Sequence, residues 1–270
     1  MRSVLRTKEA REAWDILTGD PGNALGLWDL NGATLELAPS GGEPRLDPDV
    51  RRELPLLGKW IAINGILTGW ANKQVEEIGL AAPYCHVWGQ LACEHWDCGT
   101  QTRRELVAPS PGLSVAYARL REVVKDLGLD ASRIYVRSHS LAFLYPGDTD
   151  QTVVERLVSD LGDIAEAAGD LTLLRDHGFV KLAPAGLDKV VALRRILKHI
   201  DPFKPSVILN VGDAPDRVLM EELGRIRRED GIPTLRVGVR NLRDEVDLFL
   251  PGPPRGVLPF IRALSGALAQ

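Results

Sequence analysis

Short apolar runs alternate with longer amphipathic segments along the chain, a rhythm typical of strands that alternate with helices. The clearest run, at 206–211, reads Ser-Val-Ile-Leu-Asn-Val and lies just before Asp213. A second apolar run ends in Asp29, where Asn-Gly then turns the chain, and a third, at 59–67, ends at Thr68. Apolar runs bounded by turn residues predict buried strands, each opening onto a loop at its carboxyl end.

The amphipathic segments between these runs predict helices that cover a sheet. In 114–127, Leu120, Val124 and Leu127 recur at the spacing that places them on one helical face. The predicted helices are 3–17, 49–57, 71–78, 114–127, 152–168, 187–199, 216–228 and 257–268. A single strand is predicted at 133–145, and further strands or hairpins at 83–96, 171–182, 234–239 and 246–250. Strands that alternate with helices favour a parallel sheet, so the expected fold class is α/β.

The rhythm changes between about residues 102 and 180. This stretch reads helix–strand–helix–strand with polar breaks, which is typical of a small α+β unit. We therefore expect a parallel-sheet core formed by residues 1–101 and 181–270, with 102–180 inserted as a unit that covers the sheet.

Composition excludes several classes of partner. The 270 residues are 44% hydrophobic and 26% charged, and the net charge of −4 does not suggest nucleic-acid or bulk-membrane binding, which usually needs a basic face. No apolar run approaches the roughly 20 residues of a membrane span. The first 18 residues are charged and lack the apolar core of a signal peptide, so we expect a cytoplasmic protein.

Cysteine and histidine residues gather in one short stretch: Cys85, His86, Cys93, His95 and Cys98. They raise the alternative of a zinc-binding regulatory module. The spacing Cys-x7-Cys-x4-Cys lacks the paired C-x2-C elements typical of zinc sites, and 93–99 reads as a hairpin. We therefore expect structural roles for these side chains.

Residues able to bind phosphate follow the predicted strands. Right-handed crossovers bring the carboxyl ends of parallel strands to one edge of the sheet, so Asp29, Thr68 and Asp213 should converge there. Lys189 lies near the start of a predicted helix and can reach the same edge. Two carboxylates, a hydroxyl and an ammonium suit a phosphate with a divalent cation, with Asp29 available as a nucleophile.

The order of these residues resembles that of haloacid dehalogenase-like hydrolases, from about residue 20 to 268. Four segments carry the resemblance: Asp29-Leu-Asn-Gly-Ala, Thr68-Gly69, Gly186-Leu-Asp-Lys189 and Gly212-Asp213-Ala-Pro-Asp216. Two more segments, 137–145 and 180–189, are similar to motifs of trehalose-6-phosphate phosphatases. The insert also lies where this superfamily carries its cap, between the second and third motifs.

The resemblance implies a Rossmann-like core with an α+β cap and Mg²⁺-dependent hydrolysis of a sugar phosphate through an aspartyl-phosphate. The implied catalytic residues are Asp29, Asn31, Thr68 and Lys189, and the implied Mg²⁺ ligands are Asp29, Asn31, Asp213 and Asp216. The implied substrate-binding residues are Gly69, His86, Arg137 and Lys181. Further candidates for substrate selection, taken from position alone, are Trp88, Glu94, His95 and His139.

Several positions depart from the family pattern. Asn31 replaces the second aspartate of the first motif, Ala33 its threonine, Trp70 an arginine and Val190 a glycine, while Lys181 replaces a glutamate. Asp216 follows Asp213 by three residues, fewer than is usual, which could turn its carboxylate elsewhere.

The change at Asn31 bears directly on catalysis, because an amide cannot exchange a proton near pH 7. Its backbone carbonyl could still bind the metal. The alternative is therefore a catalytically impaired or repurposed relative, a pseudophosphatase that binds a phosphorylated ligand or a partner or performs a different reaction in the same pocket.

Overall fold

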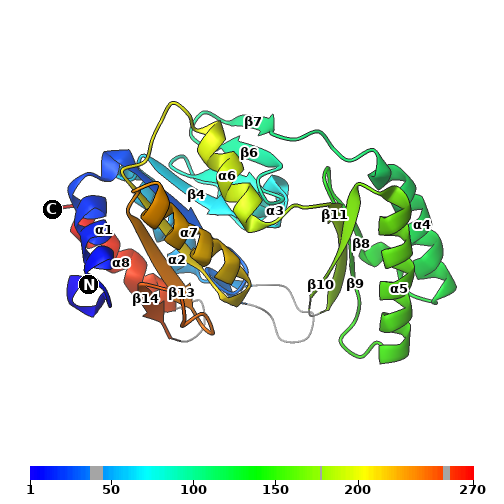
Figure 1. Ribbon diagram of the computed structural model, residues 1–270. Helices are drawn as coiled ribbons and strands as arrows, with labels where there is room; N and C mark the ends of the chain where they lie inside the picture. The colour runs from blue at the N-terminus through cyan, green and yellow to red at the C-terminus, as the bar shows by residue number, and fades with distance from the viewer. Residues whose placement is uncertain (37–44, 177, 252–255) are drawn as a thin grey trace. The chain divides into compact units, whose positions relative to one another are not determined.

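Two groups of elements, each with its own sheet, make up the computed structural model, which describes residues 1–36, 45–176, 178–251 and 256–270 (Figure 1). The core unit contains the described residues up to 106 and those from 188 onward. The insert contains 107–176 and 178–187. The predicted α/β class, a parallel-sheet core with an α+β insert, is confirmed.

The core unit is built on an eight-stranded sheet with the order β14-β13-β12-β1-β4-β5-β6-β7. Its strands are β1 (Ala24–Trp28), β4 (Ile63–Leu67), β5 (His86–Gly89), β6 (Glu94–Asp97), β7 (Thr102–Glu105), β12 (Val207–Gly212), β13 (Thr234–Val239) and β14 (Leu248–Leu250). The pairings from β14 to β5 are parallel, and β6 and β7 are antiparallel. The central strands β1 and β12 are buried along their whole length, as expected for strands covered on both faces.

Helices cover both faces of this sheet. On one face α6 (Lys189–His199) and α7 (Arg217–Glu229) lie side by side and pack on β1 and β12 (Figure 1). The other face is covered by α1 (Lys8–Gly19), α2 (Pro48–Glu53) and α8 (Val257–Leu268), and α3 (Asn72–Glu77) follows β4. Short elements complete the unit: the strands β2 (Leu35–Glu36) and β3 (Arg45–Leu46), and the 3-10 helices η1 (Arg2–Val4), η2 (Pro21–Asn23), η4 (Pro55–Lys59) and η6 (Ala214–Asp216).

The insert is an antiparallel four-stranded sheet with the order β10-β11-β9-β8. Its elements are α4 (Gly112–Asp126), η5 (Ala131–Arg133), β8 (Ile134–Val136), β9 (Leu141–Leu144), α5 (Gln151–Ala168), β10 (Leu171–Asp176) and β11 (Phe179–Pro184). The apolar faces of α4 and α5 pack on this sheet and form a separate core. The helices of the described chain include none with the length and apolar character that a membrane span requires.

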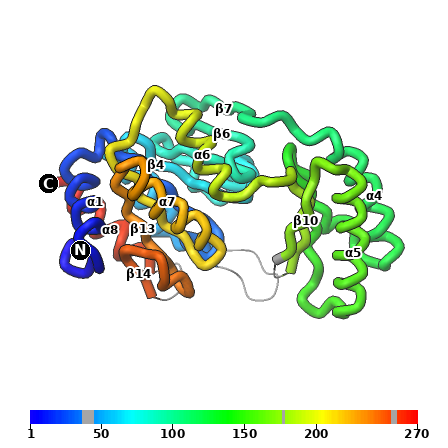
Figure 2. The backbone as a smooth tube through the Cα atoms, in the orientation of Figure 1, coloured from blue at the N-terminus to red at the C-terminus, as the bar shows by residue number. Residues whose placement is uncertain are grey.

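Two details of the insert differ from the sequence expectation. The single strand predicted at 133–145 is a hairpin, because the polar Ser-His-Ser segment turns the chain and Arg137 N–H donates to Ser140 O at 2.9 Å. The expected boundaries at 102 and 180 also shift: β7 pairs with β6 in the core sheet, and β11 runs on to Pro184. Figure 2 follows the chain from β7 to α4 and from β11 to α6. The exposed Thr-Arg-Arg-Glu of β7 carries no apolar pattern that would have marked it as a strand.

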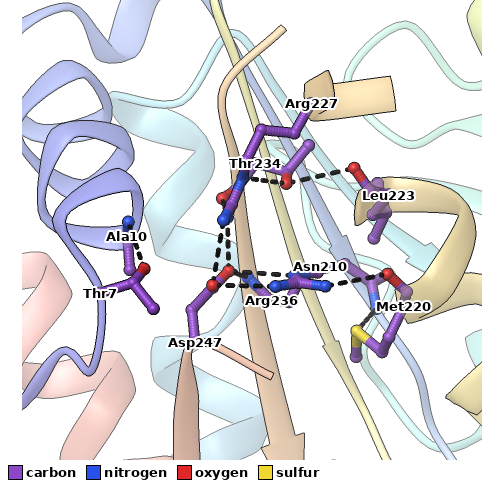
Figure 3. Close-up of polar contacts among 9 residues, drawn as sticks. All are labelled: Thr7, Ala10, Asn210, Met220, Leu223, Arg227, Thr234, Arg236 and Asp247. Carbon is purple, nitrogen blue, oxygen red and sulfur yellow. Dashed lines mark hydrogen bonds and ion pairs between the residues drawn. The ribbon is translucent and has the colours of Figure 1, made fainter. Parts of the chain in front are cut away.

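A buried carboxylate fixes the far edge of the core sheet. Asp247, which is fully buried before β14, accepts hydrogen bonds from Arg227 of α7 at 2.6 Å and from Arg236 of β13 at 2.9 Å (Figure 3). Arg236 also donates to Met220 O at 3.5 Å. Burial alone would raise the pKa of Asp247, but the hydrogen bonds and charges of Arg236 and Arg227 hold this pKa below its usual range. Asp247 therefore joins α7, β13 and β14.

Replacing Asp247 by asparagine should lower the free energy of unfolding by about 3 kcal/mol, since two partly buried guanidinium groups would lose their fully buried counter-charge. Chemical denaturation measures this loss. Asp244→Asn, at an exposed position in the same loop, is the matched control and should change the free energy by less than about 0.5 kcal/mol. Equal effects of the two substitutions would contradict the structural role of Asp247.

Candidate active site

Three of the predicted site residues lie at the carboxyl edge of the core sheet. Asp29 directly follows β1, Thr68 follows β4 and Asp213 follows β12. Because β1 lies between β4 and β12 and pairs in parallel with both, these three residues come from neighbouring strand ends. Adjacent strands are about 5 Å apart, so the side chains share a small region.

Three carboxylates meet at this edge. Asp29, Asp213 and Asp216 each place one oxygen within 4.8 Å of the other two, and all three residues are buried. The short spacing between Asp213 and Asp216 does not turn Asp216 away. The 3-10 turn of η6, in which Asp216 N–H donates to Asp213 O at 2.8 Å, returns its carboxylate to the cluster.

Lys189 joins two of these carboxylates. Its Nζ lies 2.7 Å from Asp29 Oδ1 and also forms an ion pair with Asp216 Oδ1. Lys189 is the first residue of α6, whose start is capped by Asp188 through a hydrogen bond from Val191 N–H at 2.7 Å. Burial opposes the charged ammonium, but the carboxylates of Asp216 and Asp29 outweigh it and raise the pKa of Lys189. Lys189 is therefore a fixed positive charge in the site.

Asp29 and Asp213 are destabilised as anions. Burial raises the pKa of Asp29 well above its usual range, and Asp216 and Asp213 add to the rise while Lys189 opposes it. Burial and Asp216 likewise raise the pKa of Asp213 to about 6, against Lys189 and Arg240. A bound cation would relieve this repulsion, because one ammonium cannot offset three buried carboxylates.

Two glycines leave room for the carboxylates. A Cβ atom at Gly212 would overlap Asp216 Oδ2, and one at Gly32 would overlap Asp213 Oδ2. Gly32 also has a φ of +78°, a left-handed conformation that glycine adopts without strain. The Asn-Gly turn and the Gly-Asp sequence are thus needed for close packing of the cluster as well as for turning the chain.

The donor set fits a magnesium ion. Among the described residues, Asp213 Oδ1, Asp216 Oδ2 and the side-chain oxygen of Asn31 are buried without a hydrogen-bond partner. Oxygen atoms of carboxylates and amides are the ligands that Mg²⁺ prefers. Asp29, Asn31, Asp213 and Asp216 are therefore the residues that would hold it.

Thr68 is positioned for hydrogen bonding by its loop. Its hydroxyl oxygen accepts from Trp70 N–H at 3.1 Å, and its carbonyl accepts from Leu91 N–H at 2.8 Å. The hydroxyl hydrogen can still be donated to an anion. Gly69 lies between Thr68 and Trp70, and the indole of Trp70, where the family has arginine, packs against the apolar core. No cation therefore follows Gly69.

A substrate-binding role for His86 stays a prediction, and the structure places this residue at the amino end of its strand. His86 begins β5, about 10 Å along the strand from its carboxyl end. Its Nδ1 lies 3.2 Å from His95 Nε2, and His95 Nδ1 lies 3.1 Å from His199 Nε2 at the end of α6. Trp88 stacks on His86 and His95. We call this row of hydrogen-bonded imidazoles, His86, His95 and His199, the histidine chain.

The remaining candidates occupy separate places. Glu94 Oε1 accepts from Asn72 N–H at 2.6 Å and so caps α3. Arg137 lies in the turn between β8 and β9 of the insert, and Lys181 is buried in β11 opposite Ala142. His139 is fully buried in the same unit. A role for these insert residues in substrate binding stays a prediction.

Strand geometry separates the residues of the zinc alternative. Cys85 and Cys98 pack with Val87 and Trp96 on one face of the core sheet, whereas His86 and His95 lie on the other face with Trp88. Successive side chains of a strand point to opposite faces, so Cys85 and Cys98 cannot bind one ion together with His86 and His95. In the part of the chain that the structure describes, the group able to hold a metal is the cluster of Asp29, Asp213 and Asp216.

Two residues near these features were not anticipated from the sequence. Arg240 follows β13 and lies beside Asp213; the rule that located Asp29, a polar residue at a strand end, could have found it. His199 gave no signal, because a lone histidine near a helix end is common.

Comparison with known proteins supports the architecture. No protein-family model and no curated protein sequence matches the chain. The C-terminal domain of Candida albicans trehalose-6-phosphate phosphatase matches with a TM-score of 0.71 and 15% identity, over 94% of this chain and 96% of that one. A haloacid dehalogenase-like hydrolase from Bacteroides thetaiotaomicron matches with a TM-score of 0.64 and 13% identity, over 89% and 99%. The chain has the haloacid dehalogenase-like fold.

The same fold occurs in a protein with a regulatory name. The C-terminal domain of Candida albicans trehalose synthase regulatory protein matches with a TM-score of 0.66 and 14% identity, over 97% of this chain and 98% of that one. The resemblance inferred from the motifs is thus confirmed as a likeness of fold. At these identities the haloacid dehalogenase-like fold is shared, and chemistry has to be argued from the residues of this chain.

The histidine chain should make stability depend on pH. Burial lowers the pKa of His86, His95 and His199, that of His95 to about 3, so the folded state favours the neutral form of these imidazoles. In the unfolded chain these histidines bind protons below a pH of about 6.5. The free energy of unfolding is therefore highest above that pH and decreases as the pH falls toward 3. Between pH 7.5 and 5.5, His95 alone should account for a loss of about 1 kcal/mol.

Chemical denaturation of the natural protein and of His95→Gln at both pH values checks this prediction. The substitution should reduce the acid-induced loss, whatever its effect on stability at pH 7.5. If both proteins lose the same stability between the two pH values, His95 is not the group responsible.

Proposed function

We propose that the protein is a magnesium-dependent, phosphatase-like protein that takes the phosphoryl group of a sugar phosphate onto Asp29. One observation carries the proposal: Lys189 pairs with Asp29 and Asp216 inside a buried carboxylate cluster at the carboxyl edge of the core sheet. Buried carboxylates with a fixed cation and unpaired oxygens are suited to a metal ion and a phosphate.

Asp29 has the geometry of a nucleophile. Lys189 holds its Oδ1, and no described residue forms a hydrogen bond or ion pair with Oδ2. Oδ2 would attack phosphorus, forming a P–O bond to the carboxylate while the ester P–O bond breaks and its electron pair moves to the leaving oxygen. Mg²⁺, when bound, would supply positive charge that shields the phosphoryl group from the attacking anion. The Lys189 ammonium and the Thr68 hydroxyl would bind phosphoryl oxygens.

Asn31 limits this chemistry at two points. A sugar alkoxide needs a proton as it leaves, and the Asn31 amide cannot donate one. Hydrolysis of the aspartyl-phosphate then needs a base for the attacking water, which the amide also cannot provide. We therefore propose fast phosphoryl transfer only from esters with good leaving groups, followed by slow release of phosphate.

The sugar-phosphate class is supported by the shared fold with the Candida albicans trehalose-6-phosphate phosphatase domain. We propose that the insert serves as the cap of this fold and that Arg137 and Lys181 contribute to recognition of the sugar. Lys181 is positively charged at a position where trehalose-6-phosphate phosphatases have a glutamate. The substrate of this protein therefore need not be trehalose 6-phosphate.

A second candidate is a non-hydrolytic protein that binds a phosphorylated ligand to control a partner. Two observations favour it: the amide at Asn31, and the similar fold of the Candida albicans trehalose synthase regulatory protein domain. Here the carboxylate cluster would hold the ligand and its metal without turnover.

Phosphoprotein trapping separates the two candidates. The natural protein, incubated with Mg²⁺ and an aryl phosphate, should gain one phosphoryl group by intact-mass spectrometry and turn over slowly, because aryl leaving groups need little protonation. Asp29→Asn is the control and should gain none. The proposal fails if the two proteins give the same spectrum.

Restoring the proton shuttle should raise turnover. Asn31→Asp should increase steady-state hydrolysis of a sugar phosphate by roughly 10²–10⁴-fold, the usual contribution of general acid–base catalysis. Phosphate release measures the rate. A folded Asn31→Asp protein that stays inert toward all phosphomonoesters would favour the non-hydrolytic candidate. Ordinary enzyme rates for the natural protein would show that another group moves the proton.

A further inference from the structure

Arg240 adds an unassigned cation to the carboxylate cluster. It directly follows β13, the neighbour of β12, and so lies at the same sheet edge as Asp213. If Gly32 carried a Cβ atom, that atom would lie 3.5 Å from Arg240 Nη1 and would overlap Asp213 Oδ2. The guanidinium thus lies over the turn that carries Asn31 and beside one of the candidate metal ligands.

The backbone holds Arg240 in an unfavourable conformation. Its φ of +62° is left-handed, which is costly for a residue with a side chain. One contact that fixes the turn is the hydrogen bond from Leu242 N–H to Val239 O at 3.3 Å. In addition, Leu242 O lies so close to Gly238 that a Cβ atom at position 238 would overlap this oxygen. A glycine would fit position 240 without strain.

The Arg240 guanidinium has donors to spare. It is half-buried, and within the described ranges it makes no hydrogen bond or ion pair. Lys189, by contrast, is occupied by Asp29 and Asp216. A guanidinium presents five N–H groups in a planar fork that matches phosphate oxygens. Arg240 is therefore a second cation of the site, beside Lys189, and all of its N–H donors can face an incoming anion.

Whether a phosphate can bind depends on the charge at this edge of the sheet. Three carboxyl groups within 4.8 Å of one another disfavour an incoming phosphate. A divalent cation bound to them would offset this effect, and a phosphate would then meet positive charge from the metal side and from Arg240. The same guanidinium repels the metal, because like charges this close oppose each other.

We propose that Arg240 is a phosphate-binding residue of the metal-loaded site, and that it weakens metal binding in return for anion binding. This inference rests on the proposed function for the identity of the anion. It assigns Arg240 a contact with the phosphoryl oxygens on the side of the cluster away from Thr68.

Titration calorimetry with Mg²⁺ alone, and with inorganic phosphate at saturating Mg²⁺, tests the proposal. Arg240→Gln and Arg240→Gly should each weaken phosphate binding about tenfold or more and tighten Mg²⁺ binding several-fold. The control is Arg243→Gln, which removes the same charge from an exposed arginine of the same loop. Arg243 stacks on Phe249, and its substitution should change neither the phosphate nor the Mg²⁺ dissociation constant. Opposite shifts of the two constants cannot arise from damage to the fold.

Arg240→Gly guards against misfolding, since glycine takes the left-handed conformation freely and its thermal midpoint should not fall. Unchanged phosphate binding in both Arg240 variants would overturn the proposal, and so would a loss of phosphate binding without tighter Mg²⁺ binding. Absence of phosphate binding in the natural protein would overturn it too. Failure of the proposed function would show separately, as a missing phosphoprotein on Asp29.

Discussion

The site depends on one buried ammonium group. Lys189 pairs with Asp29 and with Asp216, and these two ion pairs make it possible to bury three carboxylates within 4.8 Å of one another. Transfer of each carboxylate from water costs several kcal/mol that only a nearby cation and hydrogen bonds can offset. The position of this cation follows from the start of α6, where Asp188 caps the helix and places Lys189 in its first turn.

The remaining geometry is a consequence of the central strands. β1 and β12 are buried on both faces, so the loops after them are held rigidly at the sheet edge. Gly32 and Gly212 allow the carboxylates to approach backbone that any side chain would block. The result is a carboxylate at Asp29, a cation at Lys189 and unpaired oxygen atoms in fixed places. The proposed chemistry would lack a proton shuttle, since the residue two positions after Asp29 is the amide Asn31.

Sequence reasoning located most of this edge because strand ends are marked by local chemistry. Apolar runs closed by Asp29, Thr68 and Asp213 could be found without knowledge of the fold, and parallel pairing then brought them together. The helix 257–268 was also predicted with its exact bounds, because its apolar residues form a regular face.

The misses have other causes, some local and some long-range. His86 bonds to His95 on the neighbouring strand β6, and His95 bonds in turn to His199 of α6, 104 residues further along the chain. The hairpin at 133–145 turns at a Ser-His-Ser segment without glycine or proline. Arg240 lies in a short polar loop, and its left-handed backbone is set by packing at Gly238.

The central claim is that Asp29 accepts the phosphoryl group beside a metal held by Asp213 and Asp216. A crystal structure of the protein grown with Mg²⁺ and beryllium fluoride, a mimic of the aspartyl-phosphate, tests it most directly. The account predicts a beryllium fluoride group on Asp29 Oδ2, Mg²⁺ bound by oxygens of Asp29, Asp213 and Asp216, and Lys189 still paired with Asp216 Oδ1. Mg²⁺ bound elsewhere, or a fluoride complex on a residue other than Asp29, would contradict it.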